Sequence, residues 1–262
     1  MTPIRQSVAW WCFVPHLEPD VLIVAAKQIG YVALDLVPPD YWATVRASGL
    51  AISSIAGHGS IEFGLNNRQQ HRRILSELEQ AIKNAAAFGI PNVVCFSGSR
   101  AGLSDTDGAS ICAEALAKIA PIAESAGITL TLELLNSKID HPDYQADRTD
   151  WGITVCQMVA SPSVKLLFDI YHMQIMEGDL IRTIQANHQH IAHYHTAGNP
   201  GRHELDSSQE ISYAAVVKAI LKTGYTGFIA HEFMPRHDPI TALRQAYLLV
   251  QQQSLEVNQT NF

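Results

Sequence analysis

Residues 164–172 read Val164-Lys-Leu-Leu-Phe-Asp169-Ile-Tyr-His172, an apolar run of strand length that ends in a carboxylate. A continuous apolar run of about four to eight residues is typical of a parallel strand, because helices cover both faces of such a sheet. Similar runs recur along the chain with longer helix-compatible segments between them. The predicted strands are Ser7–Trp11, Tyr31–Leu36, Ala51–Ala56, Asn92–Phe96, Thr129–Leu134, Val164–Asp169, Ile191–Thr196 and Gly227–Glu232.

In the intervening segments, apolar residues recur with helical periodicity, and a glycine follows the end of several of them. The clearest predicted helices are Asn67–Phe88, which ends before Gly89, and Asp105–Ala126, which ends before Gly127. A left-handed glycine at these positions would cap each helix. Strands that alternate with helices predict an α/β protein with a parallel sheet.

The chain length favours closure of this sheet. A (β/α)₈ TIM barrel needs about 250 residues, and the chain has 262. The competing architecture is an open doubly wound sheet, but its nucleotide-binding motifs GxGxxG and GxxxxGK[ST] are missing at the expected places. We therefore expect residues 1–262 to form a single TIM-barrel domain.

Composition excludes several functional classes. With 18 Lys plus Arg against 25 Asp plus Glu, the net charge of −7 provides no basic surface for nucleic acid. No apolar run reaches the roughly 20 residues that span a membrane, and the N-terminus lacks the pattern of a signal peptide. The four cysteines are far apart, so we expect buried thiols rather than a disulfide framework or a zinc knuckle. We expect a cytoplasmic protein, and homo-oligomerisation is left open.

Polar residues gather at the carboxyl ends of the last four predicted strands, where the active sites of TIM barrels lie. Each of these strands ends in one metal-ligand residue type: Glu133, Asp169, His195 and Glu232. Buried carboxylates are costly unless they are paired or bind a metal. Four of these groups at one barrel mouth predict a site for one divalent cation. Oxygen ligands with one imidazole favour Mn²⁺, and Mg²⁺, Co²⁺ and Zn²⁺ are alternatives.

Four stretches carry a family resemblance. They are Leu132-Glu133-Leu-Leu-Asn136, Phe168-Asp169-Ile-Tyr-His172, His193-Tyr-His195-Thr-Ala-Gly-Asn-Pro-Gly-Arg202-His-Glu and His231-Glu232-Phe. Together they resemble the xylose-isomerase-like TIM-barrel superfamily, and within it the hydroxypyruvate isomerases and the ketose 3-epimerases. One position departs from the first group, because bacterial hydroxypyruvate isomerases usually have Gln where this chain has His195.

The resemblance implies a metal-dependent isomerase or epimerase that moves a proton on a small hydroxy-keto acid or ketose through an enediolate. It implies that Glu133, Asp169, His195 and Glu232 bind the metal, and that Glu133 and Glu232 also act as the catalytic acid/base pair. His172 and Arg202 would bind substrate oxygens. The alternative for Arg202 is a local ion pair with Glu204 or Asp206.

Three further positions are open from sequence alone. His58 ends a predicted strand between two glycines, so we expect it to line the substrate pocket. Asp35 either faces the site or forms a local salt bridge. Trp11 is expected to be a core or rim aromatic residue rather than a substrate platform.

Two other functions are alternatives. The superfamily includes apurinic endonucleases, but this chain lacks their additional metal ligands and has no cationic groove for phosphates. The other alternative is a non-catalytic metal-binding barrel.

Overall fold

The computed structural model describes residues 4–259, with side chains to residue 257. The chain divides into two compact units, each described here by itself. The first holds the described residues of Met1–Ser53, Asp179–His188 and Tyr194–Phe262, and the second holds Ser54–Gly178 and Gln189–His193. The strand β8 (Ile191–Thr196) therefore begins in the second unit and ends in the first.

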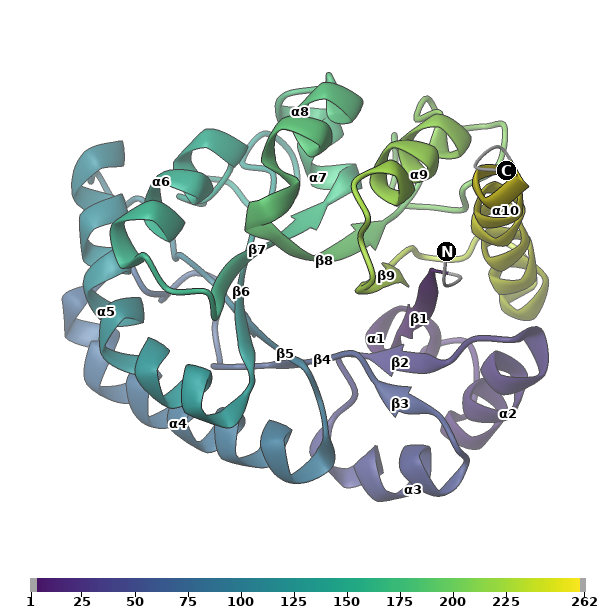
Figure 1. Ribbon diagram of the computed structural model, residues 1–262, viewed down its shortest axis with the longest axis horizontal. Coiled ribbons are helices and arrows are strands. Elements are labelled where there is room, and N and C mark those ends of the chain that lie inside the picture. The colour runs from purple at the N-terminus through teal and green to yellow at the C-terminus, as the bar shows by residue number, and fades with distance from the viewer. Residues whose placement is uncertain (1–3, 260–262) are drawn as a thin grey trace. The chain divides into compact units, whose positions relative to one another are not determined.

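In the first unit, strand β1 lies between β2 and β9, and β2 also pairs with β3; all three pairings are parallel. Helices α9 and α10 pack against each other, and α10 also contacts α2 (Figure 1). The elements of this unit are β1 (Arg5–Ala9), α1 (Trp10–Phe13), α2 (Pro19–Ile29), β2 (Ala33–Asp35), η1 (Pro39–Tyr41), α3 (Trp42–Ala47), β3 (Ala51–Ile52), α8 (Leu180–Asn187), α9 (Tyr213–Lys222), β9 (Phe228–His231) and α10 (Pro239–Gln259).

In the second unit, β4, β5, β6 and β7 form a parallel sheet in chain order. Helices α4 and α5 run side by side, and α5 contacts α6 (Figure 1). The elements of this unit are β4 (Ser54–Ala56), η2 (Arg68–Gln70), α4 (His71–Phe88), β5 (Asn92–Cys95), α5 (Asp105–Ala126), β6 (Thr129–Glu133), α6 (Thr149–Val159), β7 (Val164–Asp169) and α7 (Ile170–Met176); η3 (His188–His190) leads into β8.

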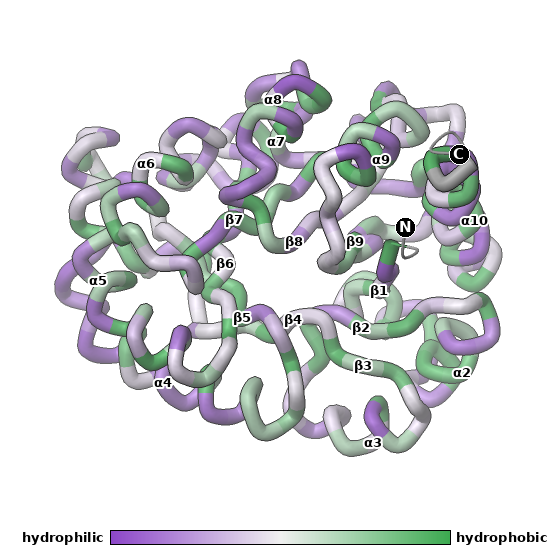
Figure 2. Tube along the Cα trace, viewed as in Figure 1, coloured by the Kyte–Doolittle hydropathy of each residue, from purple (hydrophilic) through white to green (hydrophobic). Residues whose placement is uncertain are grey.

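The helices form where periodicity and caps agree. On α4, Ile74, Leu78 and Ile82 are almost completely buried, and the tube in Figure 2 changes repeatedly between hydrophobic and hydrophilic along this helix. The predicted left-handed caps are confirmed at Gly89, with φ of 68°, and at Gly127, with φ of 66°. These glycines end the helices because a left-handed residue without a Cβ carries no steric cost.

Two sequence predictions about strands need correction. Ala51–Ala56 is not one strand, because its first residues pair with β2 and its last residues pair with β5, with Ser53 between them. The predicted strand Ser7–Trp11 ends at Ala9, and Trp10 begins the short helix α1. The predicted bounds of β7 and β8 are confirmed. Among the described residues, no helix is long and apolar enough to cross a membrane.

Candidate active site

Glu232 follows directly after β9. Several polar side chains of the first unit contact it, and together they form the candidate site in this unit. The side chain of Glu232 is buried, and its backbone N–H donates to the carbonyl of Thr196 at the end of β8 (3.0 Å). Burial by itself raises the pKa of Glu232, but the charges of His195 and Arg202 lower it more, and the pKa lies well below its ordinary value. Glu232 is therefore a carboxylate at neutral pH.

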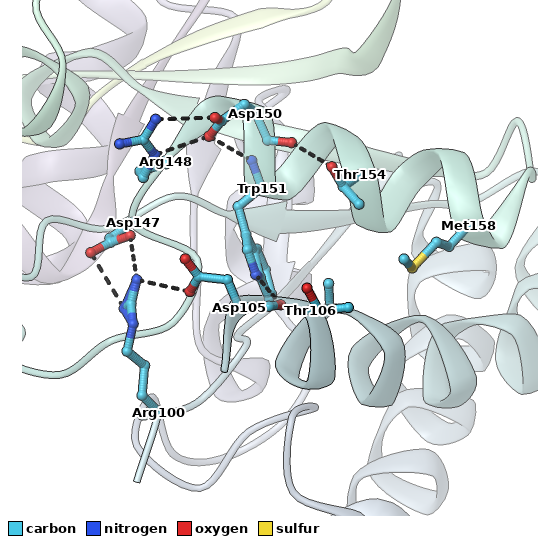
Figure 3. Close-up of a pocket in the computed structure, with 10 residues that line it drawn as sticks. Arg100, Asp105, Thr106, Asp147, Arg148, Asp150, Trp151, Thr154 and Met158 are labelled. Atoms are coloured by element: carbon cyan, nitrogen blue, oxygen red, sulfur yellow. Dashed lines mark hydrogen bonds and ion pairs between the residues drawn. The ribbon is translucent and has the colours of Figure 1, made fainter. Parts of the chain in front are cut away.

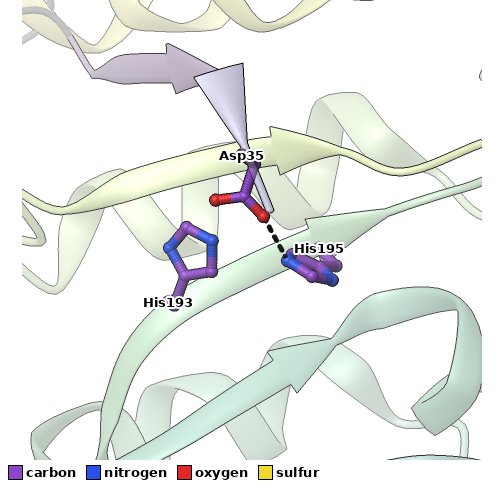
Figure 4. Close-up of side chains that lie close together, drawn as sticks. All are labelled: Asp35, His193 and His195. Carbon is purple, nitrogen blue, oxygen red and sulfur yellow. Dashed lines mark hydrogen bonds and ion pairs between the residues drawn. The ribbon is translucent and has the colours of Figure 1, made fainter. Parts of the chain in front are cut away.

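His195 lies between two carboxylates. Its imidazole points toward Asp35, as Figure 4 shows. Its Nε2 atom is 3.0 Å from Asp35 Oδ2, and its Nδ1 atom is 3.0 Å from Glu232 Oε2. All three side chains are buried, and Asp35 also accepts a hydrogen bond from the hydroxyl of Ser53. Asp35 thus contacts a residue far away in the sequence rather than forming a local salt bridge. Histidine and glutamate, as at His195 and Glu232, are residue types that bind divalent metals.

Arg202 is the cation of this group. Its Nη2 atom donates to Glu232 Oε2 at 2.5 Å, and its guanidinium lies 5.2 Å from the ring centre of Trp11. The local ion pair considered for Arg202 belongs instead to Arg236, which binds Glu204 (3.1 Å). Arg202 has a positive φ of 59°, so the chain turns there.

Trp11 belongs to the site, which sequence reasoning missed. Its indole Nε1 donates to Glu232 Oε1 at 2.8 Å. The sequence signal for this role was that Trp11 lies at the carboxyl end of the first strand, where TIM barrels place their active sites. Reading Trp11 as part of that strand concealed this signal.

In the second unit, Glu133 and Asp169 end the neighbouring strands β6 and β7. Both side chains are buried, and each offers a carboxylate oxygen within 4.8 Å of the other's. The hydroxyl of Tyr144 donates to the backbone carbonyl of Glu133 (3.0 Å). Asp169 caps α7, because its Oδ1 atom accepts from the backbone N–H groups of Tyr171 (2.8 Å) and His172 (3.1 Å).

His172 joins Asp169 in this group. The backbone N–H of Asn136 donates to its Nδ1 atom (3.1 Å), so the ring proton of neutral His172 is on Nε2. That Nε2 atom lies 3.7 Å from Asp169 Oδ2. His172 is fully buried, with Asp140 Oδ2 3.9 Å from its Nδ1 atom. Its Nε2–H is thus the group that could donate to a substrate oxygen.

His58 follows β4 in the second unit, two residues after the end of that strand. Its Nε2 atom accepts from the backbone N–H of Phe96 (3.0 Å), and burial lowers its pKa to about 4. Among the described residues, no hydrogen bond joins it to Glu133, Asp169 or His172. Its substrate role stays a prediction.

His231 is a core histidine rather than a ligand. Its Nε2 atom donates to Gln6 Oε1 (3.0 Å), its Nδ1 atom accepts from the Thr196 hydroxyl (2.9 Å), and burial lowers its pKa to about 3. Its side chain alternates with that of Glu232 along the chain, as expected at a strand end.

A separate cavity of about 370 Å³ lies at the starts of α5 and α6 (Figure 3). Its charged groups pair with each other: Arg100 with Asp147 (3.0 Å) and Arg148 with Asp150 (3.0 Å). No sequence-predicted site residue lines it. We therefore do not place the chemistry in this cavity.

Parallel strands with polar carboxyl ends, separated by helices, are the features of a TIM-barrel protein. A family model described as "Xylose isomerase-like TIM barrel" matches residues 25–252. The chain therefore belongs to the xylose isomerase-like TIM-barrel family, which confirms the predicted family and fold class.

Curated relatives give the class of activity. The chain is 29% identical over 260 residues to "Putative hydroxypyruvate isomerase" of Homo sapiens, covering 93% of this chain and 94% of that protein. It is 37% identical over 123 residues to "2-oxo-tetronate isomerase" of Cupriavidus necator, covering 47% and 46%. The protein is accordingly an enzyme of the isomerase or epimerase type.

Solved structures support the fold. An L-ribulose 3-epimerase matches with a TM-score of 0.81 at 18% identity, covering 99% of this chain and 98% of that one. An AP endonuclease, family 2, from Brucella melitensis matches with a TM-score of 0.80 at 22% identity, covering 92% and 97%. An IOLI protein with a bound zinc atom matches with a TM-score of 0.74 at 15% identity, covering 99% of each.

Proposed function

We propose that this protein is a metal-dependent isomerase of a small 2-oxo acid, which interconverts hydroxypyruvate and tartronate semialdehyde. The reaction moves a proton between adjacent carbons through an enediolate of the substrate. We further propose that residues 1–262 form one barrel domain, and that Glu133, Asp169, His195 and Glu232 lie at the carboxyl ends of its strands. The support is that active sites of TIM barrels lie at the carboxyl ends of their strands.

The donor groups fit a divalent metal. Two buried carboxylates within 4.8 Å of each other, as with Glu133 and Asp169, repel unless a cation or a proton lies between them. His195 Nδ1 and Glu232 Oε2, 3.0 Å apart, are a second pair of ligand atoms. We propose Mn²⁺ for this oxygen-rich set. When bound, such an ion polarises a substrate carbonyl and stabilises negative charge that develops on its oxygen.

The chain's own groups move the proton. Glu232 is ionised and accepts hydrogen bonds from Trp11 and Arg202, which fix the orientation of its carboxylate. We assign Glu232 and Glu133 as the pair of carboxylates that removes a proton from one substrate carbon and returns one to its neighbour. The Nε2–H of His172 is assigned to a substrate oxygen.

The observation that carries the choice of substrate is the position of Arg202. A guanidinium that already binds the carboxylate of Glu232, at 2.5 Å, is well placed to bind the carboxylate of a 2-oxo acid beside it. A neutral ketose would leave this cation without an anionic partner on the substrate.

One observation favours a second function, ketose 3-epimerisation. The position of His195 has histidine in the 3-epimerases that the chain resembles, and its Nδ1 atom lies beside Glu232 as a ligand would. In that reaction the second glutamate returns the proton to the opposite face of the same carbon.

The test is incubation of the protein with Mn²⁺ in D₂O, followed by NMR detection of deuterium at carbon. The panel contains hydroxypyruvate, tartronate semialdehyde, 2-oxo-tetronate and D-fructose. We expect exchange and isomerisation with the 2-oxo acids. Exchange only at C3 of the ketose would favour the epimerase. No exchange with any compound, despite Mn²⁺ binding, would contradict both functions.

A further inference from the structure

Asp35 is a buried carboxylate to which the proposed proton transfer assigns no role. It is the last residue of β2, where its backbone pairs with Ala9 of β1, and its side chain has no exposed surface. A carboxylate in such a place must be compensated by hydrogen bonds or charge. The next residue, Leu36, has a positive φ of 51°, so the chain turns away directly after it.

The contacts of the Asp35 side chain with Ser53 and His195 show how it is held. Its Oδ1 atom accepts from the Ser53 hydroxyl, and its Oδ2 atom lies 3.0 Å from His195 Nε2. A carboxylate oxygen only accepts hydrogen bonds, so Nε2 of His195 carries a proton. In the neutral imidazole this leaves the lone pair on Nδ1.

That lone pair faces Glu232. Nδ1 of His195 and Oε2 of Glu232 are 3.0 Å apart, and both are electron-pair donors when the imidazole is neutral. Without a metal, a proton on Nδ1 joins these two atoms, and this is the charged form of His195 that acts on Glu232. A divalent cation bound to Nδ1 would replace that proton, because a metal-binding histidine is neutral. A histidine that ligates a metal through one nitrogen commonly donates from the other to a carboxylate.

We propose that Asp35 is a positioning residue that holds His195 in the Nε2–H tautomer, so that Nδ1 is the atom that binds the metal. This inference rests on the proposed function, because it takes His195 as a ligand. It adds Asp35, with Ser53 behind it, to the residues that determine metal affinity.

The first experiment measures Mn²⁺ affinity by calorimetry on the full chain after removal of metal with a chelator. Asp35→Asn keeps the shape of the side chain but removes its charge, and we expect affinity to fall about 10–100-fold. The matched control is Asp40→Asn, an exposed aspartate in η1, which should bind Mn²⁺ as the wild type does.

A double-mutant cycle separates positioning from general damage. In a His195→Gln background the contact with Nε2 is gone, so Asp35→Asn should cause little additional loss of affinity. Equal losses in both backgrounds would overturn the inference, because Asp35 would then act independently of His195.

A measurement on the wild type does not depend on whether any variant folds. With Zn²⁺ as a diamagnetic probe, ¹⁵N NMR of the His195 ring should show a proton on Nε2 and a metal-bound Nδ1. A proton on Nδ1, or binding through Nε2, would overturn the inference while leaving metal binding intact. A wild type that binds neither Mn²⁺ nor Zn²⁺ would instead overturn the proposed function, and this inference with it.

Discussion

Two histidines show how differently the two units of the chain stabilise their polar groups. In the first unit, His195 has a carboxylate oxygen 3.0 Å from each ring nitrogen. In the second unit, His58 instead accepts from a backbone N–H, and burial lowers its pKa to about 4. The same contrast holds for the acids, because Glu232 pairs with Arg202 whereas Asp169 accepts from two backbone N–H groups.

This difference has a physical consequence. When a buried group is stabilised by charged side chains, removal of one charge leaves the others without compensation. This is destabilising, because an unpaired buried charge is costly. A group compensated by backbone N–H donors keeps them when a side chain elsewhere is substituted. We therefore expect substitutions of charged partners in the first unit to change activity, and substitutions of His58 and Asp169 in the second unit to change stability as well.

The largest effect is expected from Glu232→Gln. Loss of a positioned acid/base group should lower kcat on hydroxypyruvate by about 10²–10⁴-fold, and Glu133→Gln should do the same. Steady-state kinetics measures kcat of each variant. The control is Glu79→Gln, at an exposed side chain on α4. Turnover like that of the wild type in both site variants would contradict the acid/base assignment.

A smaller effect is expected from Arg202→Ala. Hydrogen bonds to charged groups contribute about 1.5–3 kcal/mol, so kcat/KM for a 2-oxo acid should fall about 10–100-fold. A neutral ketose should lose less. The control is Arg182→Ala, an exposed arginine on α8. Equal losses for the acid and the ketose would show that Arg202 does not bind the substrate carboxylate.

The pH dependence of stability tests whether His58 is neutral in the folded protein. His58 has a pKa of about 4 when folded, below its ordinary 6.5, so between these values the unfolded chain binds a proton that the folded chain excludes. Stability should therefore fall as the pH drops below 6.5, by about 2 kcal/mol at pH 5 from this group. Urea unfolding at pH 7.5 and pH 5 should show less acid sensitivity in His58→Gln. His16→Gln, at an exposed position, should leave the sensitivity unchanged.

The smallest effect concerns the cap of α7. Asp169→Ala removes the acceptor of two backbone N–H groups, whereas Asp169→Asn keeps an acceptor oxygen. Both substitutions remove the charge, so the free energy of unfolding should be lower for Asp169→Ala than for Asp169→Asn by about 1 kcal/mol. Urea unfolding in the presence of a chelator measures both without a contribution from metal. Equal stability of the two variants would show that the cap does not matter.

The sequence predicted the strand ends well because an apolar run followed by an acid is a local pattern. Residue type and position also predict Glu133, Asp169, His195 and Glu232 as metal ligands, and that assignment stays a prediction. The sequence could not identify the partners of His195, because Asp35 is 160 positions away and the contact depends on which strands adjoin and which rotamers they permit.

The contacts of Arg202 and Trp11 differ from those that their neighbours in the sequence suggest. Glu204 and Asp206 are near Arg202 in sequence, yet the positive φ at Arg202 turns the chain, and its guanidinium reaches Glu232. Trp11 was included in the predicted strand Ser7–Trp11 because the strands were read as apolar runs. In the structure it lies in the helical turn that follows, where it donates to Glu232.

The start of α7 has a consequence for how this enzyme could acquire new substrates. Asp169 ends a strand, caps a helix and is assigned to the metal, so a replacement would have to satisfy all three demands at once. Arg202 lies in a loop, where no helix depends on it. Laboratory evolution toward another substrate would therefore be expected to change residue 202 and its neighbours early, and residue 169 last.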